Sequence, residues 1–190
     1  MVRNNCSHIC TRFSINKDVY KHLRFLNLEQ NGIASWDELS GLRVLNDLTH
    51  LIVNKNHIKE IYYKPGFRGL KSLSFEDNLI SDWTTFDALN EFDSRITEVR
   101  AAGNPVIGKG KIQIGTDANP IDLSKEGGND ELNKAKCIAV SRMEFLKKYN
   151  GTKVTENERK DVELFYMKHA LETYLTEVMV VEKEEDRVLT

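Results

Sequence analysis

The sequence predicts an α/β fold, a leucine-rich-repeat solenoid. Three observations support this prediction. The pattern L-x-x-L-x-L-x-x-N-x-L returns four times. After two of its asparagines the apolar spacing changes to three residues, and near the C-terminus a helical apolar stripe follows a capping box. We therefore expect a right-handed solenoid with a parallel sheet on its concave side, short 3₁₀ or helical segments on its convex side, and a C-terminal capping helix.

Each repeat places apolar residues at fixed positions around an asparagine. The asparagines are Asn31, Asn56, Asn78 and Asn104, separated by 25, 22 and 26 residues. Strands are predicted near 23–28, 48–53, 70–75 and 96–101, with inward-pointing apolar side chains that one repeat alone could not bury. The apolar positions are Leu23, Leu26, Leu28 and Ile33; Leu48, Leu51, Val53 and Ile58; Leu70, Leu73, Phe75 and Ile80; and, more weakly, Ile96, Val99, Ala101 and Val106.

The residues after each strand predict how the chain turns. We expect the asparagine side chains to hydrogen-bond to backbone where the chain leaves the strand. Beyond Asn31 and Asn78 the three-residue spacing indicates a 3₁₀ turn or a short helix. Trp36 and Trp83 each follow their asparagine by five residues, so we expect both in the convex-side core and not as exposed binding anchors.

Residues 135–181 are predicted to form the last repeat and the cap, because a solenoid needs an atypical unit over its final apolar edge. Thr155 to Glu158 predict a capping box that opens a helix from about 156 to about 181. A degenerate repeat start precedes it at Met143, Leu146 and Tyr149. The expected packing stripe of the helix is Val162, Phe165, Tyr166, Leu171, Leu175 and Val178.

The remaining boundaries follow from composition. We assign residues 1–19 to an N-terminal extension, 20–106 to the repeats and 182–190 to a charged tail. Residues 107–134 are rich in Gly, Asn, Asp and Lys, and we expect a long flexible loop there.

Composition and motifs argue against several classes of function. A net charge of −2 with both signs interspersed argues against nucleic acid as the main partner. The sequence has no apolar run of membrane-spanning length and no continuous apolar N-terminal run, so we expect no membrane partner and a cytoplasmic location. The near-match to a phosphate-binding loop at 103–110 ends in Gly110 where a hydroxyl is needed, and Cys6, His8 and Cys10 fit no familiar zinc spacing. We therefore expect no catalytic site, no cofactor and no metal, hence a non-enzymatic binding scaffold.

The binding face is predicted from strand alternation, because residues between the inward positions point out of the core. These positions are Phe25, His50, Ser72 and Glu98; Asn27, Ile52, Ser74 and Arg100; and Glu29, Asn54 and Glu76. Their mixture of apolar, amide and charged groups suits a protein partner. We expect Phe25, Ile52 and Arg100 to contribute most to binding. The convex side and the 107–134 loop stay open as alternative surfaces.

Three segments of the chain point to a particular family: the segment from Leu73 to Trp83 with its Asn78, the turn Gly103-Asn104-Pro105, and the closing segment from Leu146 through Tyr166. In these segments the chain resembles the leucine-rich-repeat region of tubulin-folding cofactor E, also called tubulin-specific chaperone E. The resemblance implies a chaperone module that binds α-tubulin and works with other tubulin-folding cofactors in assembling or taking apart the tubulin heterodimer. A cytoskeletal association would accompany that role.

The resemblance has departures. Members of that family usually carry a glycine-rich cytoskeleton-binding domain before the repeats and a ubiquitin-like domain after them, and residues 1–22 and 182–190 are too short for either. We therefore expect a fragment, a short isoform or a reduced relative, with a longer 107–134 loop. The alternative function is a general intracellular leucine-rich-repeat adaptor, of the phosphatase-regulator-like, dynein-assembly-like or spliceosomal kind.

Overall fold

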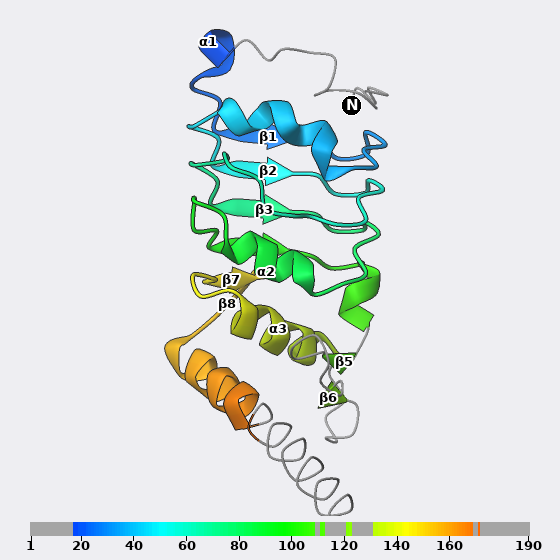
Figure 1. Ribbon diagram of the computed structural model, residues 1–190, viewed down its shortest axis with the longest axis vertical. Helices are drawn as coiled ribbons and strands as arrows, with labels where there is room; N and C mark the ends of the chain where they lie inside the picture. Colours follow the sequence, from blue (N-terminus) through cyan, green and yellow to red (C-terminus); the bar gives the residue numbers. More distant parts are fainter. Residues whose placement is uncertain (1–16, 109–110, 113–120, 123–130, 169–170, 172–190) are drawn as a thin grey trace, which may run out of the picture.

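The solenoid is built on one mainly parallel sheet, seen in a computed structural model that describes residues 17–108, 111–112, 121–122, 131–168 and 171 (Figure 1). The sheet has six strands in the order β1-β2-β3-β4-β7-β8, and all but β8 run parallel. Its strands are β1 (Phe25–Asn27), β2 (His50–Ile52), β3 (Ser72–Ser74), β4 (Glu98–Arg100), β7 (Lys148–Tyr149) and β8 (Thr152–Lys153). The first four lie inside the predicted strands, so the predicted solenoid and its parallel sheet are confirmed.

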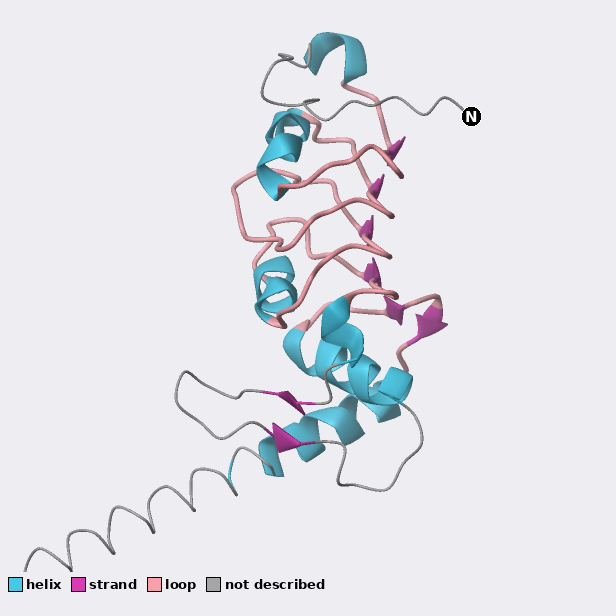
Figure 2. Cartoon of the chain, turned by 90° about the vertical axis from the view of Figure 1, so that its right-hand side faces the viewer, coloured by secondary structure: helices cyan, strands magenta, loops and turns pink. Residues whose placement is uncertain are grey.

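The other elements lie on the convex side and at the two ends (Figure 2). The convex side carries the 3₁₀ helix η1 (Trp36–Val44) and the helix α2 (Thr84–Asn90). One end of the solenoid carries α1 (Lys17–Tyr20). Toward the other end lie η2 (Pro105–Gly108), the antiparallel pair β5 (Lys111–Ile112) and β6 (Ile121–Asp122), α3 (Glu131–Arg142) and a helix over 156–168. The concave side therefore exposes the sheet, while the convex side is covered by these segments.

The core is continuous between the sheet and the convex segments. Leu51, Leu73 and Val99 are partners in the register of neighbouring strands, and each is at most 1% exposed. Trp36 and Trp83 are buried at 3% and 6% exposure, which confirms their predicted place in the convex-side core. Trp36 lies against Phe67 and Phe92, so aromatic rings fill the space behind the sheet.

The repeat asparagines join neighbouring repeats through backbone groups. The Asn78 side-chain oxygen accepts from the Ile58 amide, and its Nδ2 donates to the carbonyls of Val53 and Phe75. Asn56 and Asn104 repeat this arrangement one repeat away on either side. All three are buried, so each side chain satisfies backbone groups that water cannot reach, as the sequence predicted.

A left-handed residue precedes every repeat asparagine. Gln30, Lys55, Asp77 and Gly103 have φ values of 59°, 53°, 53° and 73°. At Gly103 a side chain would also collide, since a Cβ atom there would lie 2.0 Å from Asp77 Oδ1. The chain therefore makes the same sharp turn after each of the four strands, and this turn orients the side chain of the asparagine that follows.

The C-terminal cap is held by charged side chains. Arg159 donates to the carbonyls of Val140, Met143 and Leu146, the last at 2.7 Å. Lys136, which is 8% exposed, pairs with Glu158 at 2.5 Å. The predicted capping box is confirmed, because the Glu158 amide donates to Thr155 Oγ1 and the Thr155 amide donates to the Glu158 carboxylate.

Three details of this end differ from the prediction. The predicted 107–134 loop contains the end of η2, the short β5–β6 pair and the beginning of α3, while 109–110, 113–120 and 123–130 lie outside the described residues. The helix α3 was not predicted, because in its sequence Lys and Asn interrupt the apolar spacing, although Ala135 and Ile138 pack in the core. In the last helix Val162 is buried and Phe165 packs against the core, but Leu171 is 58% exposed. Leu175 and Val178 lie outside the described residues, as does the 182–190 tail.

Candidate protein-binding face

The predicted binding positions form straight columns across the concave sheet. The register pairs Phe25 with His50, His50 with Ser72, and Ser72 with Glu98. The second column follows in the same way through Asn27, Ile52, Ser74 and Arg100. The strands of a sheet lie about 4.8 Å apart, so each column offers evenly spaced side chains along the solenoid axis.

The first column has a fifth member that the prediction omitted. Lys148 of β7 is the register partner of Glu98 and is exposed. The signal for Lys148 is present in the sequence, because Lys148 directly precedes the inward-pointing Tyr149 of the degenerate repeat, just as Glu98 precedes Val99.

Part of the predicted face is occupied by bonds within the protein. Ser74 is only 5% exposed and donates to Asn54 Oδ1 at 2.7 Å. The same oxygen accepts from the Glu76 amide, and Asn54 Nδ2 donates to the Glu76 carboxylate. The prediction that Ser74 is accessible was therefore wrong, because its hydroxyl is buried against the Asn54 side chain of the neighbouring repeat. Asn54 and Glu76 serve largely to hold the turn.

The accessible part of the face combines apolar and charged groups. Phe25 is 56% exposed, and its ring lies 6.2 Å from that of His50. At the other end of the columns the Glu98 carboxylate lies 3.9 Å from both Arg100 Nε and Lys148 Nζ. An apolar region near β1 thus continues into a charged cluster near β7. Such a pattern suits a folded protein partner better than a small apolar ligand.

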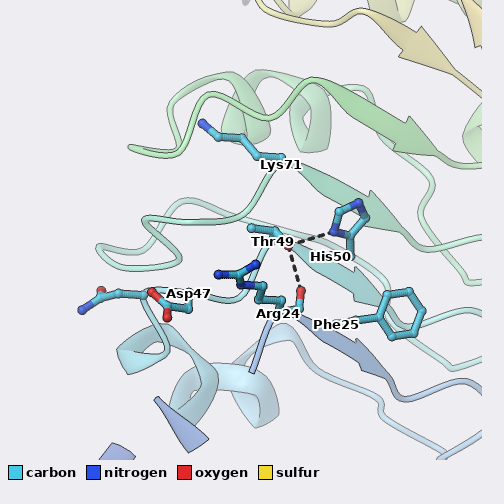
Figure 3. Close-up of a pocket in the computed structure, with 7 residues that line it drawn as sticks. Arg24, Phe25, Asp47, Thr49, His50 and Lys71 are labelled. Carbon is cyan, nitrogen blue, oxygen red and sulfur yellow. Dashed lines mark hydrogen bonds between the residues drawn. The ribbon is translucent and has the colours of Figure 1, made fainter. Parts of the chain in front are cut away.

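An open hollow of about 650 Å³ continues the face past the start of β1 and β2 (Figure 3). Arg24, Phe25, Thr49, His50 and Lys71 are among its lining residues. Thr49 Oγ1 donates to the Arg24 carbonyl and lies 2.9 Å from His50 Nδ1 (Figure 3). Arg24, Lys71 and Asp47 give this rim charged groups of both signs, and Lys71 Nζ donates to the Ser94 carbonyl.

The opposite rim, where the chain leaves the strands, carries the third predicted column. Glu29 accepts from Lys55 at 2.7 Å, and this hydrogen bond raises the pKa of Lys55. The Glu29 amide donates to Asn27 Oδ1, and this hydrogen bond holds the backbone of Glu29 in place. Glu29 is paired with Lys55, and Glu76 accepts from Asn54, so this rim also carries charged groups that are already engaged within the protein.

Within the described ranges the structure contains no cluster of three or more potential metal ligands. The Cys6, His8 and Cys10 set lies outside those ranges. Over the same described portion, no helix is both long and apolar enough to cross a membrane.

Comparisons with known proteins agree with the sequence resemblance. No family model matches the chain. It is 27% identical to tubulin-folding cofactor E of Arabidopsis thaliana over 88% of its length, and 26% identical to the tubulin-specific chaperone cofactor E-like protein of Rattus norvegicus over 82%. It is also 27% identical to tubulin-specific chaperone E of Dictyostelium discoideum over 78%. The chain spans about a third of the length of these relatives, between 30% and 36%.

A solved structure supports the fold independently. A chain in the crystal structure of the Drosophila melanogaster SNF/U2A′ complex superposes with a TM-score of 0.62 over 87% of this chain and 79% of that chain. Its sequence identity is 15%, so this likeness concerns the fold alone. Taken together, the repeats, the sheet and the relatives show a leucine-rich-repeat chain that is related in sequence to the tubulin-folding cofactor E and cofactor E-like proteins.

Proposed function

We propose that this chain is a non-enzymatic scaffold that binds α-tubulin and acts with other tubulin-folding cofactors in the cytoplasm, in association with the cytoskeleton. The observation that carries the proposal is the similarity to two tubulin cofactor E proteins and one cofactor E-like protein, which extends over 78–88% of this chain. Because the chain corresponds to about a third of each relative, the proposed role is the binding step and not the whole activity of the longer proteins.

The concave face is the proposed contact surface. Phe25 is exposed and Ile52 is half-buried, and both supply apolar contact area, while Arg100 supplies a charged group whose side chain is 49% exposed. Large exposed apolar groups and arginine are typical of residues that dominate protein interfaces. Glu98 and Lys148 border Arg100, and charged pairs of this kind would add specificity.

The test is capture of α-tubulin from cell extract by the immobilised chain, measured by quantitative immunoblot. The triple variant Phe25→Ser, Ile52→Ser and Arg100→Glu removes the two apolar groups and reverses the charge. We expect this variant to capture at least about tenfold less α-tubulin than the parent, since a hot-spot residue contributes about 2 kcal/mol or more to binding. Its melting temperature should stay near that of the parent, because these side chains project from the sheet.

A matched control makes the same types of substitution at residues outside the sheet. Val44→Ser, Leu79→Ser and Lys59→Glu change two exposed apolar residues and one exposed lysine, none of them in a strand. This control should capture α-tubulin as the parent does. Equal capture by the folded concave-face variant would assign binding to another surface, and a phosphatase subunit or a ribonucleoprotein as the dominant captured protein would favour the general adaptor.

A further inference from the structure

The last helix, over 156–168, is apolar on two opposite faces. Val162 is 6% exposed and Phe165 packs against the solenoid core, so one face is already in use. Leu164 and Met167 are 63% and 58% exposed. At 3.6 residues per turn, Leu164 lies about 200° around the helix from Val162. The second apolar face therefore points away from the solenoid that the first face covers.

The exposed face has the spacing of a coiled-coil seam. Leu164, Met167 and Leu171 are separated by three and then four residues, and all three are at least 58% exposed. The same alternation continues in the sequence through Tyr174, Val178 and Val181, which lie outside the described residues. A 3-4 repeat of apolar residues is the pattern with which helices pair side by side in water.

Two charged residues border this seam on opposite sides. With Leu164 and Leu171 at heptad positions a, Glu163 occupies position g and Lys168 occupies position e. In a parallel pair of identical helices, g of one helix faces e of the next heptad in the other. Glu163 of one copy would then face Lys168 of its partner twice by symmetry, whereas an antiparallel pair would oppose like charges.

We propose that the seam formed by Leu164, Met167 and Leu171 joins two copies of this chain in a parallel coiled coil. The arrangement leaves both solenoids free, because each helix holds its own solenoid with the face opposite the seam. The described N-terminal helix α1 also has exposed apolar residues, Val19 and Tyr20, but it lies at the far end of the solenoid and cannot cover this seam in the same copy (Figure 1).

The first test is the mass in solution of the full chain, measured by light scattering after size exclusion at about 100 µM. We expect twice the chain mass of 21.8 kDa. The variant Leu164→Glu, Met167→Glu and Leu171→Glu should be a monomer, since six buried carboxylates cannot share one seam. The control Val19→Glu, Val44→Glu and Leu79→Glu places the same charges at exposed apolar sites elsewhere and should stay dimeric. A monomeric parent or a dimeric seam variant would overturn the proposal.

The second test asks whether the partner is a parallel second copy. Glu163→Lys and Lys168→Glu each oppose like charges across the seam, and either should weaken dimerisation by about five- to thirtyfold. The double variant exchanges the two charges and should restore the parent affinity. Glu163 lies 3.7 Å from Arg159 in its own helix, and Lys168 also has an interaction within its own chain. Recovery in the double variant separates the effect between copies from these contacts. Failure of the double variant to recover would exclude parallel self-pairing.

This inference is independent of the proposed tubulin-binding role. The seam variant keeps the concave face, so a monomer that still captures α-tubulin supports both proposals. A dimeric chain that captures no α-tubulin would contradict only the proposed function.

Discussion

The repeats and the cap belong to one solenoid, yet they are stabilised in different ways. In the repeats, buried leucines and the asparagines Asn56, Asn78 and Asn104 make the same contacts again and again. In the cap, the main polar contacts occur once each: Arg159 on three carbonyls, and Lys136 on Glu158. The repeats therefore share their stability between neighbours, while the cap depends on a few individual side chains.

This difference predicts where a substitution acts. A change in a middle repeat removes contacts from both neighbouring repeats, so its effect on the free energy of unfolding should be large and should involve the whole solenoid. A change in the cap removes contacts at one end only, so its effect should be smaller and local.

Leu73→Ala tests the repeat side of the comparison and should have the largest effect. Leu73 has no exposed surface and is the register partner of both Leu51 and Val99. Its truncation leaves a cavity that should cost about 2–5 kcal/mol in free energy of unfolding. Urea denaturation measures this value. Leu79→Ala, at a site that is 43% exposed, should cost under about 0.5 kcal/mol, and similar costs for both variants would contradict the assigned core.

Asn56→Ala and Asn78→Ala test the hydrogen-bonded ladder and should come next. Each leaves buried backbone groups of two repeats without a partner, at a cost on the order of 1–3 kcal/mol. Thermal melts measure the loss. Asn31→Ala is the internal control, because Asn31 is half-buried and its side chain donates to the Glu29 carbonyl within its own repeat. If Asn31→Ala destabilises as much as Asn78→Ala, the bonds between repeats are not the cause.

The repeats could be predicted from the sequence because their contacts recur. The spacing of the asparagines fixed the register of the strands, and with it the columns that contain Phe25 and Arg100. The capping box could be predicted for another reason, since Thr155 and Glu158 bond to each other's backbone and need no distant partner. Local contacts and periodic contacts can therefore be predicted from a single sequence.

Contacts that occur once and join distant residues could not be predicted. Nothing in the sequence near Arg159 indicates that it reaches the carbonyls of Val140 and Leu146, because those contacts depend on how α3 and the last helix cross. The burial of Ser74 likewise depends on its hydrogen bond to Asn54 in the neighbouring strand. Alternation predicts which way a side chain points, but not how closely its neighbours surround it.

Acid should loosen the cap before the repeats, and this is the smallest effect we predict. Burial opposes the charge of Glu158, but hydrogen bonding to Lys136 and to the Thr155 backbone outweighs it and lowers the pKa of Glu158 below its ordinary value of 4.5. A carboxyl group whose pKa is lower in the folded protein than in the unfolded chain stabilises the folded protein at pH values above its unfolded pKa. This stabilisation is lost as the pH falls below about 4.5 and through the folded pKa of Glu158.

Glu158→Gln isolates this contribution. Glutamine can still accept from the Thr155 amide, as capping boxes with Gln do, but it cannot form the ion pair with Lys136. At pH 7 we expect faster amide hydrogen exchange in 156–168, corresponding to a loss on the order of 0.2–1 kcal/mol, with exchange in the sheet unchanged. Below the folded pKa the parent carboxyl is protonated and resembles the glutamine, so the two proteins should exchange alike. A difference that persists at low pH would mean that Glu158 supports the cap through hydrogen bonds and packing, and the cap would then resemble the repeats more than it differs from them.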